Sequence, residues 1–276
     1  MTRVADALAE ARARGVASLD AQLLLARILA TTRTGLIAHD ERVLDADERA
    51  CWASWLDRRA AGEPIAYLLG EKEFCGLSLA VRAGVLVPRP ETELLVDWAG
   101  ELLAEEAAEA RVLDLGTGSG AIALALKHRH RSARVTAVDA SAAALEVARA
   151  NARRLGLDIE FLEGSWWKPI GARRFDVVVA NPPYVAAGDP HLAALVHEPV
   201  EALVAGAEGL DAIAEIVRSS HGHLVAGGWL LIEHGFDQGA AVRALFSAEA
   251  YTAVETRRDL AGDERVTAGR RADATP

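Results

Sequence analysis

Two short motifs carry residue types that could do chemistry, and each directly follows an apolar, strand-like run. The stretch 116–120 reads Gly-Thr-Gly-Ser-Gly after the run 111–115, and the stretch 181–184 reads Asn-Pro-Pro-Tyr after the run 175–180. Glycines let a backbone turn tightly and approach a ligand without Cβ clashes, so the first motif predicts a cradle for a nucleotide-like cofactor. The second motif predicts a clamp for a planar amide or amino nitrogen.

The glycine-rich loop differs from the common phosphate-binding motifs, because it has neither their G-x-G-x-x-G spacing nor a Lys-Ser/Thr ending. Asp139 ends the next apolar run, 23 residues after Gly116. A carboxylate there can accept hydrogen bonds from both ribose hydroxyls. A helix N-cap is the alternative role for Asp139, although Ser141 competes for it. Asp114, inside the first strand, needs a partner and is expected to hold the loop or the cofactor's ammonium group.

The segment that contains the loop and these two acids resembles class I S-adenosylmethionine-dependent methyltransferases. The resemblance implies S-adenosylmethionine as the cofactor and methyl transfer as the reaction. It also implies adenine contacts from the stretch 163–167, Glu-Gly-Ser-Trp-Trp, which follows the third expected strand. The expected cofactor-binding residues are Asp114, Gly116, Thr117, Gly118, Ser119, Gly120, Asp139, Ser165, Trp166 and Asn181.

The Asn-Pro-Pro-Tyr motif suits the activation of an sp² nitrogen. An amide nitrogen is a poor nucleophile because its lone pair is delocalised, and two acceptors that hold its N–H groups make it competent. The side-chain oxygen of Asn181 and the backbone carbonyl of Pro182 can supply both acceptors. Pro183 stiffens the loop and Tyr184 can pack against the planar group. Positioning and desolvation would then supply most of the rate, with no metal required. A plain turn after a strand is the alternative interpretation.

The elements that position these motifs follow from the hydrophobic periodicity. Residues 1–69 are expected to form a small helical bundle, and residues 70–87 a β-hairpin linker. Residues 88–270 alternate strands with helices, which predicts an α/β domain with a mostly parallel, Rossmann-like sheet covered on both faces. Residues 271–276 are expected to be a disordered tail.

Seven strands are expected in this larger domain, the last two of them antiparallel at the sheet edge. A helix from Pro90 to about residue 107 is expected to open the domain. The expected strands are 112–115, 134–138, 159–162, 175–180, 229–233, 251–255 and 265–268, and the helices between them are 119–127, 142–155 and 211–224.

The composition narrows the class of partner. The chain has 276 residues and a formal charge of −10, which lowers the expectation of a nucleic-acid ligand and suits a protein or small molecule. Its two cysteines, Cys51 and Cys75, indicate neither a disulfide framework nor a zinc site. No apolar run reaches the ~18 residues of a membrane span. A cytoplasmic protein without a metal or a membrane partner is therefore expected.

From about residue 19 to 270 the chain resembles the HemK/PrmC family, the protein-(glutamine-N5) methyltransferases that act on peptide chain release factors. The Asn-Pro-Pro-Tyr motif alone also occurs in enzymes acting on nucleobase amines, so the other segments carry the resemblance. They are Gly-Glu-Pro-Ile-Ala-Tyr-Leu-Leu-Gly at 62–70, Pro-Arg-Pro-Glu-Thr-Glu at 88–93, the loop 116–120, Glu-Pro at 198–199, Gly-Leu-Asp at 209–211 and Gly-Gly-Trp at 227–229.

The resemblance implies methylation of the glutamine in the Gly-Gly-Gln loop of bacterial release factors, which modulates translation termination, with the helical domain docking that substrate. The loop 116–120 and Asp139 match the family's cofactor positions, Trp166 a cofactor-adjacent one, and 181–184 the glutamine clamp. Ser165 stands where the family usually has an acid, which weakens the expected contact to the adenine amino group. Ala205-Gly206 replaces a typical Gly-Gly pair.

Two other functions are compatible with the motifs, namely methylation of a DNA or RNA exocyclic amine and binding of S-adenosylmethionine without catalysis. The first would need a basic groove and an extruded base. The role of Arg89 is open between guiding the substrate loop and pairing with Glu93. Glu233 and His234 end a strand near the expected site without an assigned role.

Overall fold

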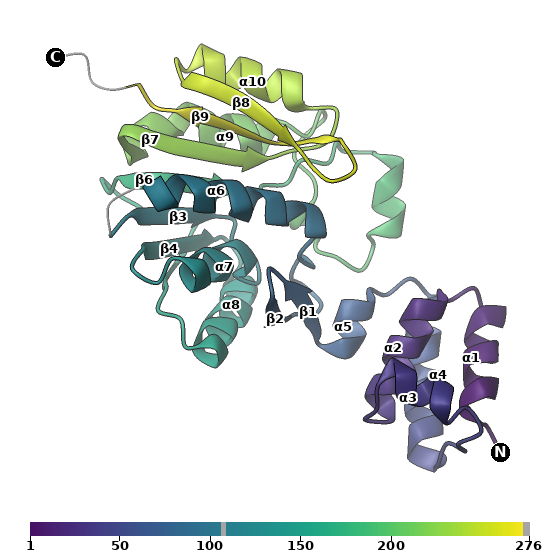
Figure 1. Ribbon diagram of the computed structural model, residues 1–276. Coiled ribbons are helices and arrows are strands. Elements are labelled where there is room, and N and C mark those ends of the chain that lie inside the picture. The colour runs from purple at the N-terminus through teal and green to yellow at the C-terminus, as the bar shows by residue number, and fades with distance from the viewer. Residues whose placement is uncertain (106–108, 273–276) are drawn as a thin grey trace. The chain divides into compact units, whose positions relative to one another are not determined.

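The computed structural model describes residues 1–105 and 109–272 and divides the chain into two compact units (Figure 1). The first unit comprises Met1–Glu71 and the second Lys72–Pro276. Parts of two expectations lie outside the described residues: the end of the helix predicted to reach residue 107, and most of the tail predicted from residue 271. Among the described residues, no helix has both the length and the apolar character needed to cross a bilayer.

The first unit is a small helical bundle, as the periodicity predicts. Its core contains buried leucine, alanine and valine side chains together with Trp52. Asp45 and Glu48 form a capping box at the start of the fourth helix, in which Glu48 N donates to Asp45 Oδ1 at 2.8 Å and Asp45 N donates to Glu48 Oε2 at 3.0 Å. The helices are α1 (Val4–Ala13), α2 (Ser18–Ile28), α3 (Arg33–Ala38), α4 (Ala46–Ala60) and α5 (Ile65–Leu69).

The linker hairpin is shorter than the range 70–87 suggests. Strands β1 (Glu71–Phe74) and β2 (Leu77–Ala80) pair across a turn at Cys75 and Gly76, both of which have positive φ. After Ala80 the chain leaves the hairpin. It turns at Gly84, which has a φ of +88°, and Val85 then packs against another part of the second unit. This stretch forms no strand, and most of it lines a cavity.

The second unit contains the expected seven-stranded sheet, in the order β5-β4-β3-β6-β7-β9-β8. The first five strands are parallel, and β9 runs antiparallel to both β7 and β8. This arrangement confirms the class I methyltransferase fold predicted from the alternating pattern. The strands are β3 (Arg111–Leu115), β4 (Arg134–Asp139), β5 (Glu160–Glu163), β6 (Phe175–Ala180), β7 (Leu224–Glu233), β8 (Thr252–Arg258) and β9 (Glu264–Arg270).

Helices cover both faces of the sheet (Figure 1). One apolar cluster joins the sheet to α6 (Glu93–Glu105), α7 (Ala121–Arg129) and α8 (Ala142–Leu155). A second cluster joins the other face to α9 (Asp211–Ser219) and α10 (Gly239–Ala248). The sequence pattern did not indicate α10, whose short apolar face rests on Val242 and Phe246, four residues apart and fully buried. Short 3-10 turns complete the unit: η1 (Pro90–Thr92), η2 (Pro190–Ala194), η3 (Val200–Ala202) and η4 (Ser220–His223).

Most element boundaries differ from the sequence expectation by one to three residues, and two differences at the α9–β7 connection have a clear structural cause. The helix expected over 211–224 ends at Ser219 and continues only as the turn η4. Strand β7 begins at Leu224 rather than at Trp229, and its register against β6 shifts between the pairs Phe175–Leu224 and Val177–Trp229. The extra residues include Gly227 and Gly228, which make the start of the strand unrecognisable from β-propensity alone.

The strand order determines where a ligand can bind. Strand β3 lies between β4 and β6, so the chain changes direction across the sheet at β3. The register pairs Leu115 with Ala180, the last residues of β3 and β6. The loops after these two strands therefore begin side by side at the carboxyl edge of the sheet. In a doubly wound sheet this switch point is where ligands bind.

Candidate active site

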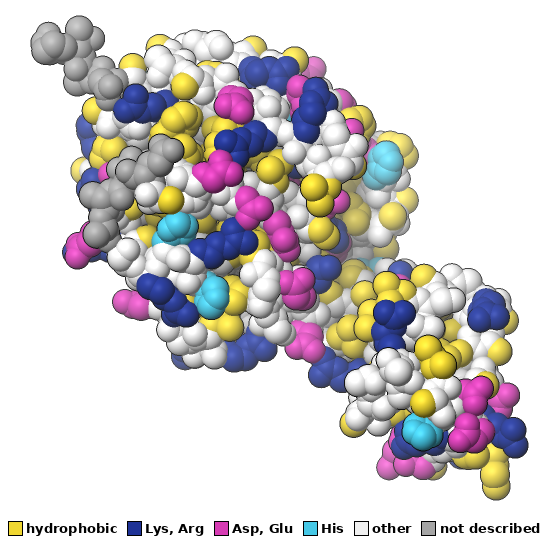
Figure 2. Space-filling model, viewed as in Figure 1, with side chains coloured by type: hydrophobic (Ala, Val, Ile, Leu, Met, Phe, Trp, Pro, Cys, Tyr) yellow, Lys and Arg dark blue, Asp and Glu magenta, His cyan; other side chains and the backbone are white. Residues whose placement is uncertain are grey.

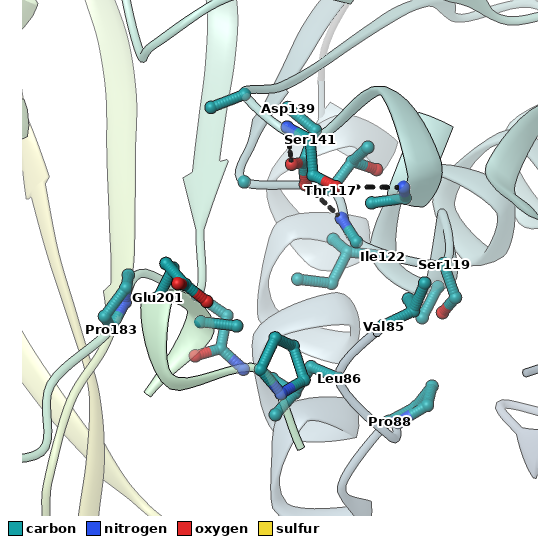
Figure 3. A pocket seen from close by; sticks show the side chains of 18 of the residues that line it. Val85, Leu86, Pro88, Thr117, Ser119, Ile122, Asp139, Ser141, Pro183 and Glu201 are labelled. Atoms are coloured by element: carbon teal, nitrogen blue, oxygen red, sulfur yellow. Dashed lines mark hydrogen bonds between the residues drawn. The ribbon is translucent and has the colours of Figure 1, made fainter. Parts of the chain in front are cut away.

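A cavity of about 510 Å³ opens at this switch point within the second unit (Figure 3). Its walls come from segments far apart in the sequence: 84–89, the loop after β3, the end of β4, the turn after β5, and Asn181 after β6. Parts of the 3-10 turns η1 and η3 complete the lining through Thr92, Glu201 and Ala202. The cradle and the clamp motifs thus share one cavity.

The glycine-rich loop forms the floor of the cavity. Gly116 has a φ of +76°, and a Cβ on it would lie 3.3 Å from Trp166 Cζ3. Gly120 has a φ of +86°, and its Cβ would meet Leu124 Cδ1 at 3.0 Å and Ala148 Cβ at 3.2 Å. Both positions therefore require glycine, Gly116 to bring the backbone to the cavity and Gly120 to seat the loop on the helices beneath it. Thr117, Gly118 and Ser119 also line the cavity, whereas Gly120 does not.

Asp114 holds this loop from behind. Its Oδ2 accepts hydrogen bonds from Thr117 Oγ1 at 2.6 Å and from Ala123 N at 3.2 Å. The side chain is fully buried, and burial raises the pKa of Asp114 to about 7. Asp114 is not among the residues that line the cavity. These contacts correspond to the expected role of holding the loop. Its Oδ1 has no hydrogen-bond partner among the described residues, and a contact to the cofactor's ammonium group stays a prediction.

Asp139 lines the cavity at the end of β4 (Figure 3). Its Oδ2 accepts from Gly118 N at 2.7 Å and its Oδ1 from Ser141 N at 2.8 Å. A carboxylate offers about four lone-pair sites, so acceptor capacity is left for hydroxyl groups of a ligand. Burial raises the pKa of Asp139 above its ordinary value. Ser141 caps α8 by accepting from Ala144 N at 3.2 Å, so Asp139 is not the helix cap.

Ser165 and Trp166 form another wall after β5. Trp166 has a φ of +47°, an uncommon conformation for a residue with a side chain. Its ring lies against Gly116, as the distance above shows, so the tryptophan and the glycine-rich loop shape the same end of the cavity. Gly164 N donates to Asp139 O at 3.0 Å, which ties this turn to the end of β4.

The first residue of the clamp motif lines the cavity and has a partner that the sequence did not suggest. Asn181 Nδ2 donates to Thr92 Oγ1 at 3.1 Å, across 89 residues of sequence. Because Thr92 holds the amide nitrogen, the side-chain oxygen is the amide atom left to accept an N–H group of a ligand. Pro183 also lines the cavity.

Pro182 and Tyr184 lie away from the cavity surface. Pro182 is buried, and neither residue is among those that line the cavity. Tyr184 Oη lies 3.5 Å from Glu233 Oε1, and burial raises the pKa of the tyrosine. Tyr184 O accepts from Gln238 Nε2 at 3.0 Å. These contacts hold the tyrosine against Glu233 and Gln238, and its packing against a planar ligand group stays a prediction.

Arg89 lines the cavity and pairs with Glu198, not with Glu93. Glu198 is 5% exposed, and its Oε2 also accepts from Val87 N at 3.0 Å. Glu93 instead accepts from Cys75 N at 3.0 Å. One buried carboxylate thus joins the segment before η1 to the long loop after β6, and it holds the guanidinium at the cavity wall.

Replacing Glu198 with glutamine is expected to lower the free energy of unfolding by about 1–3 kcal/mol, because the amide cannot satisfy both the guanidinium and Val87 N–H. The matched control is Glu146→Gln, which removes the exposed Arg82–Glu146 pair. That change should cost at most about 0.5 kcal/mol. Urea unfolding of both variants measures the difference, and equal costs would contradict the structural role given to Glu198.

Asn151 is another residue that the motifs did not reveal. It is fully buried in α8, where its Oδ1 accepts from Ala80 N at 2.7 Å. Its Nδ2 donates to Ala80 O and to Ser119 O, both at 3.0 Å. Asn151 therefore binds the end of the hairpin to the glycine-rich loop. The only sequence signal was an amide among alanines on the buried face of the helix.

The chain matches two family models and several known proteins. Residues 92–253 match the Methyltransferase small domain, and residues 1–70 match the PrmC N-terminal domain. The release factor glutamine methyltransferase of Pseudomonas aeruginosa is 46% identical over 256 residues, which cover 92% of each chain. That of Bordetella pertussis is 46% identical over 272 residues, which cover 98% of this chain and 99% of the other.

A solved structure agrees at the level of the fold. The Thermus thermophilus 16S rRNA N2 G1207 methyltransferase, in complex with S-adenosylmethionine and guanosine, has a TM-score of 0.56 and 21% identity, covering 73% of this chain and 49% of the other. The sequence relatives are far more similar and span nearly the whole chain. The HemK/PrmC resemblance inferred from the motifs is confirmed, and the chain belongs to the family of release factor glutamine methyltransferases.

Proposed function

We propose that this protein transfers the methyl group of S-adenosylmethionine to the side-chain N5 of the glutamine in the Gly-Gly-Gln motif of bacterial peptide chain release factors, and so modulates translation termination. One observation carries the proposal: the glycine-rich loop and Asn181 line the same cavity, in a chain that belongs to this family. The reaction needs a site for the methyl donor and, next to it, a site that holds the substrate amide.

The residues around the cavity fit the cofactor. Gly116 brings bare backbone to the cavity wall, where a Cβ would crowd Trp166. The Asp139 carboxylate has acceptor capacity for the ribose hydroxyls, and Ser165 and Trp166 stand where adenine contacts are expected. S-adenosylmethionine, when bound, supplies an electrophilic methyl group on its sulfonium. Ser165 offers a hydroxyl in place of the usual acid, so its hydrogen bond to the adenine amino group is expected to be weaker.

The clamp would act on the glutamine by orientation. The side-chain oxygen of Asn181 would accept one N–H of the substrate amide. The backbone carbonyl of Pro182 would accept the other, and because Pro182 does not line the cavity, its carbonyl would have to turn toward the bound glutamine. With both N–H groups held out of the amide plane, the nitrogen lone pair is less delocalised and can point at the methyl group. Exclusion of water and alignment then supply the rate. Pro183 stiffens the loop, and Arg89, held by Glu198, would contact the substrate chain.

The domain organisation suits a protein substrate. In this proposal residues 1–69 dock the release factor, residues 70–87 link the two parts, residues 88–270 carry out methyl transfer, and 271–276 form a tail. The helical residues 1–70 match a domain model named for this family, which supports a family-specific task for them. The protein would work in the cytoplasm, where release factors act.

A protein substrate is also favoured over a nucleic acid by charge. The net charge is −10, and acidic and basic side chains are interspersed over the face of the second unit shown in Figure 2. Enzymes that bind a nucleic-acid backbone concentrate basic side chains on one face. Direct binding of nucleic acid is therefore not part of the proposed activity.

The deciding experiment incubates the protein with S-adenosylmethionine and a purified bacterial release factor, and then analyses the tryptic peptide that contains Gly-Gly-Gln by mass spectrometry. The expected result is the gain of one methyl group on the glutamine, and none on a release factor in which that glutamine is replaced by alanine. A parallel reaction with total RNA and DNA should incorporate no label. Methylated nucleic acid together with an unmodified release factor would overturn the proposal.

A further inference from the structure

A chain of polar contacts runs from the clamp to a buried carboxylate. Asn181 Nδ2 donates to Thr92 Oγ1 at 3.1 Å. The Thr92 hydroxyl lies beside Glu233, which sits at the end of β7 and is 1% exposed. One oxygen of this carboxylate, Oε2, is buried and has no other hydrogen-bond partner among the described residues. Tyr184 Oη lies 3.5 Å from the same carboxylate. Thr92 is itself 4% exposed, so the chain runs from the cavity wall into the interior.

The carboxylate of Glu233 sets the direction of both hydrogen bonds between Asn181, Thr92 and Glu233. An ionised carboxylate can only accept, so the Thr92 hydroxyl must donate its single proton to Glu233. The threonine oxygen is then available only as an acceptor toward Asn181, and it selects the NH₂ end of the amide. Rotation of that amide by 180° would place two oxygens against each other. The carboxylate therefore determines which atom of Asn181 can accept from a ligand.

We propose that Thr92 and Glu233 are positioning residues, which hold the Asn181 amide with its oxygen directed at the substrate glutamine and its nitrogen directed away. This inference rests on the proposed function, because the oxygen matters only if a substrate N–H must be accepted there. Without the carboxylate, Thr92 can donate to Asn181 instead. The flipped amide would then present an NH₂ group to the substrate NH₂, which repels it and leaves the nitrogen unactivated.

The surroundings of Glu233 make the direction of the hydrogen bonds from Glu233 through Thr92 to Asn181 sensitive to pH. The titratable groups around Glu233 are Glu91 in η1, Tyr184 after β6, Arg265 on β9 and the next residue in the sequence, His234. Burial raises the pKa of Glu233 to about 7, opposed by the Thr92 hydroxyl and by Arg265. Below this pKa the carboxyl carries a proton and can donate to Thr92, so the fraction of correctly oriented Asn181 falls as pH falls.

The test uses three variants of the whole protein in the release factor assay. Thr92→Val removes the hydroxyl at nearly constant volume, Thr92→Ser retains it, and Glu233→Gln keeps the shape but supplies a donor. We expect kcat to fall roughly 10- to 100-fold in Thr92→Val and Glu233→Gln, because misplacement of a positioning group costs about this much. Thr92→Ser, which keeps the hydroxyl, should retain most of the wild-type kcat. The affinity for S-adenosylmethionine, measured by calorimetry, should change less than about threefold in all three.

The pH profile separates positioning from a purely structural role. In the wild-type protein kcat should rise with pH through about 7, as Glu233 loses its proton. This limb should be absent in Glu233→Gln, whose side chain does not titrate. A structural role alone would lower the melting temperature of the variants without removing the limb.

The outcomes also distinguish this inference from the proposed function. If the wild-type protein methylates the release factor while Thr92→Val and Glu233→Gln retain full kcat and the same pH limb, the positioning role is overturned and the function stands. If the wild-type protein leaves the release factor unmodified, the proposed function fails first. Folding of each variant is verified by its thermal unfolding, and Thr92→Ser serves as the matched control should Thr92→Val be unstable.

Discussion

Replacing Asn181 with alanine is expected to reduce the rate of methyl transfer to a release factor by about 10²- to 10³-fold, with a much smaller loss of cofactor affinity. Loss of one preorganised polar group at a reacting centre typically costs this much. Asn181 lines the cavity, and its nitrogen is held by Thr92 at 3.1 Å, so the oxygen is preorganised before substrate arrives. The loss should appear in kcat, because the substrate amide can still enter the cavity without being held in the reactive orientation.

The measurement is a single-turnover assay with labelled S-adenosylmethionine, combined with calorimetry of cofactor binding. Asn181→Asp is the informative companion, since it keeps an acceptor oxygen but loses the N–H that donates to Thr92. It should retain more activity than the alanine variant if the acceptor matters most, and less than the wild type. An alanine variant within tenfold of the wild-type rate would remove Asn181 from the mechanism.

Replacing Asp139 with asparagine is expected to weaken S-adenosylmethionine binding by about 10- to 100-fold. The two carboxylate oxygens accept from Gly118 N at 2.7 Å and from Ser141 N at 2.8 Å. An asparagine has one oxygen and one NH₂, so it must lose at least one of these bonds and meets an N–H with an N–H. Charge-assisted hydrogen bonds to a ligand's hydroxyls would be lost as well, each contributing about 1.5–3 kcal/mol at most.

Asp176→Asn is the matched control for this prediction. Asp176, near the start of β6 and outside the residues that line the cavity, also accepts a backbone bond, from Arg111 N at 2.7 Å. Its replacement should lower stability somewhat and leave cofactor affinity unchanged. Calorimetry on both variants decides the matter. If the two variants bind S-adenosylmethionine with the same affinity as the wild type, Asp139 does not contact the cofactor.

Much of the fold was predictable because its determinants are local. The branched apolar runs that became β3, β4 and β6 lie within windows of five or six residues, and the buried periodicity of α8 predicted its ends at Ala142 and Leu155. The glycine-rich loop was equally visible, because left-handed backbone at Gly116 and Gly120 is encoded by residue type. Helix α10 and the early start of β7 were missed where the pattern was short or interrupted by glycine.

The partners of the site residues were not predictable in the same way. Ser141 rather than Asp139 caps α8, which is a local choice between two neighbours that only the side-chain geometry resolves. The pairing of Arg89 with Glu198 joins positions 109 residues apart, and no spacing rule connects them. Glu93, which the sequence offered as one possible partner of Arg89, instead accepts a hydrogen bond from Cys75 N in the hairpin turn.

The sequence by itself indicated the chemistry that we propose for this protein, through a glycine-rich loop, an acid at the next strand end and an Asn-Pro-Pro-Tyr motif in a chain recognisable as a family member. Only the tertiary structure decided which atom of Asn181 faces Thr92, and in our proposal the buried Glu233 sets that choice. The physical reason is that backbone conformation and periodicity are properties of neighbouring residues. The direction of a buried hydrogen bond depends instead on groups that are distant in the sequence. Here the strand order brings such a group, Glu233 at the end of β7, close to the site.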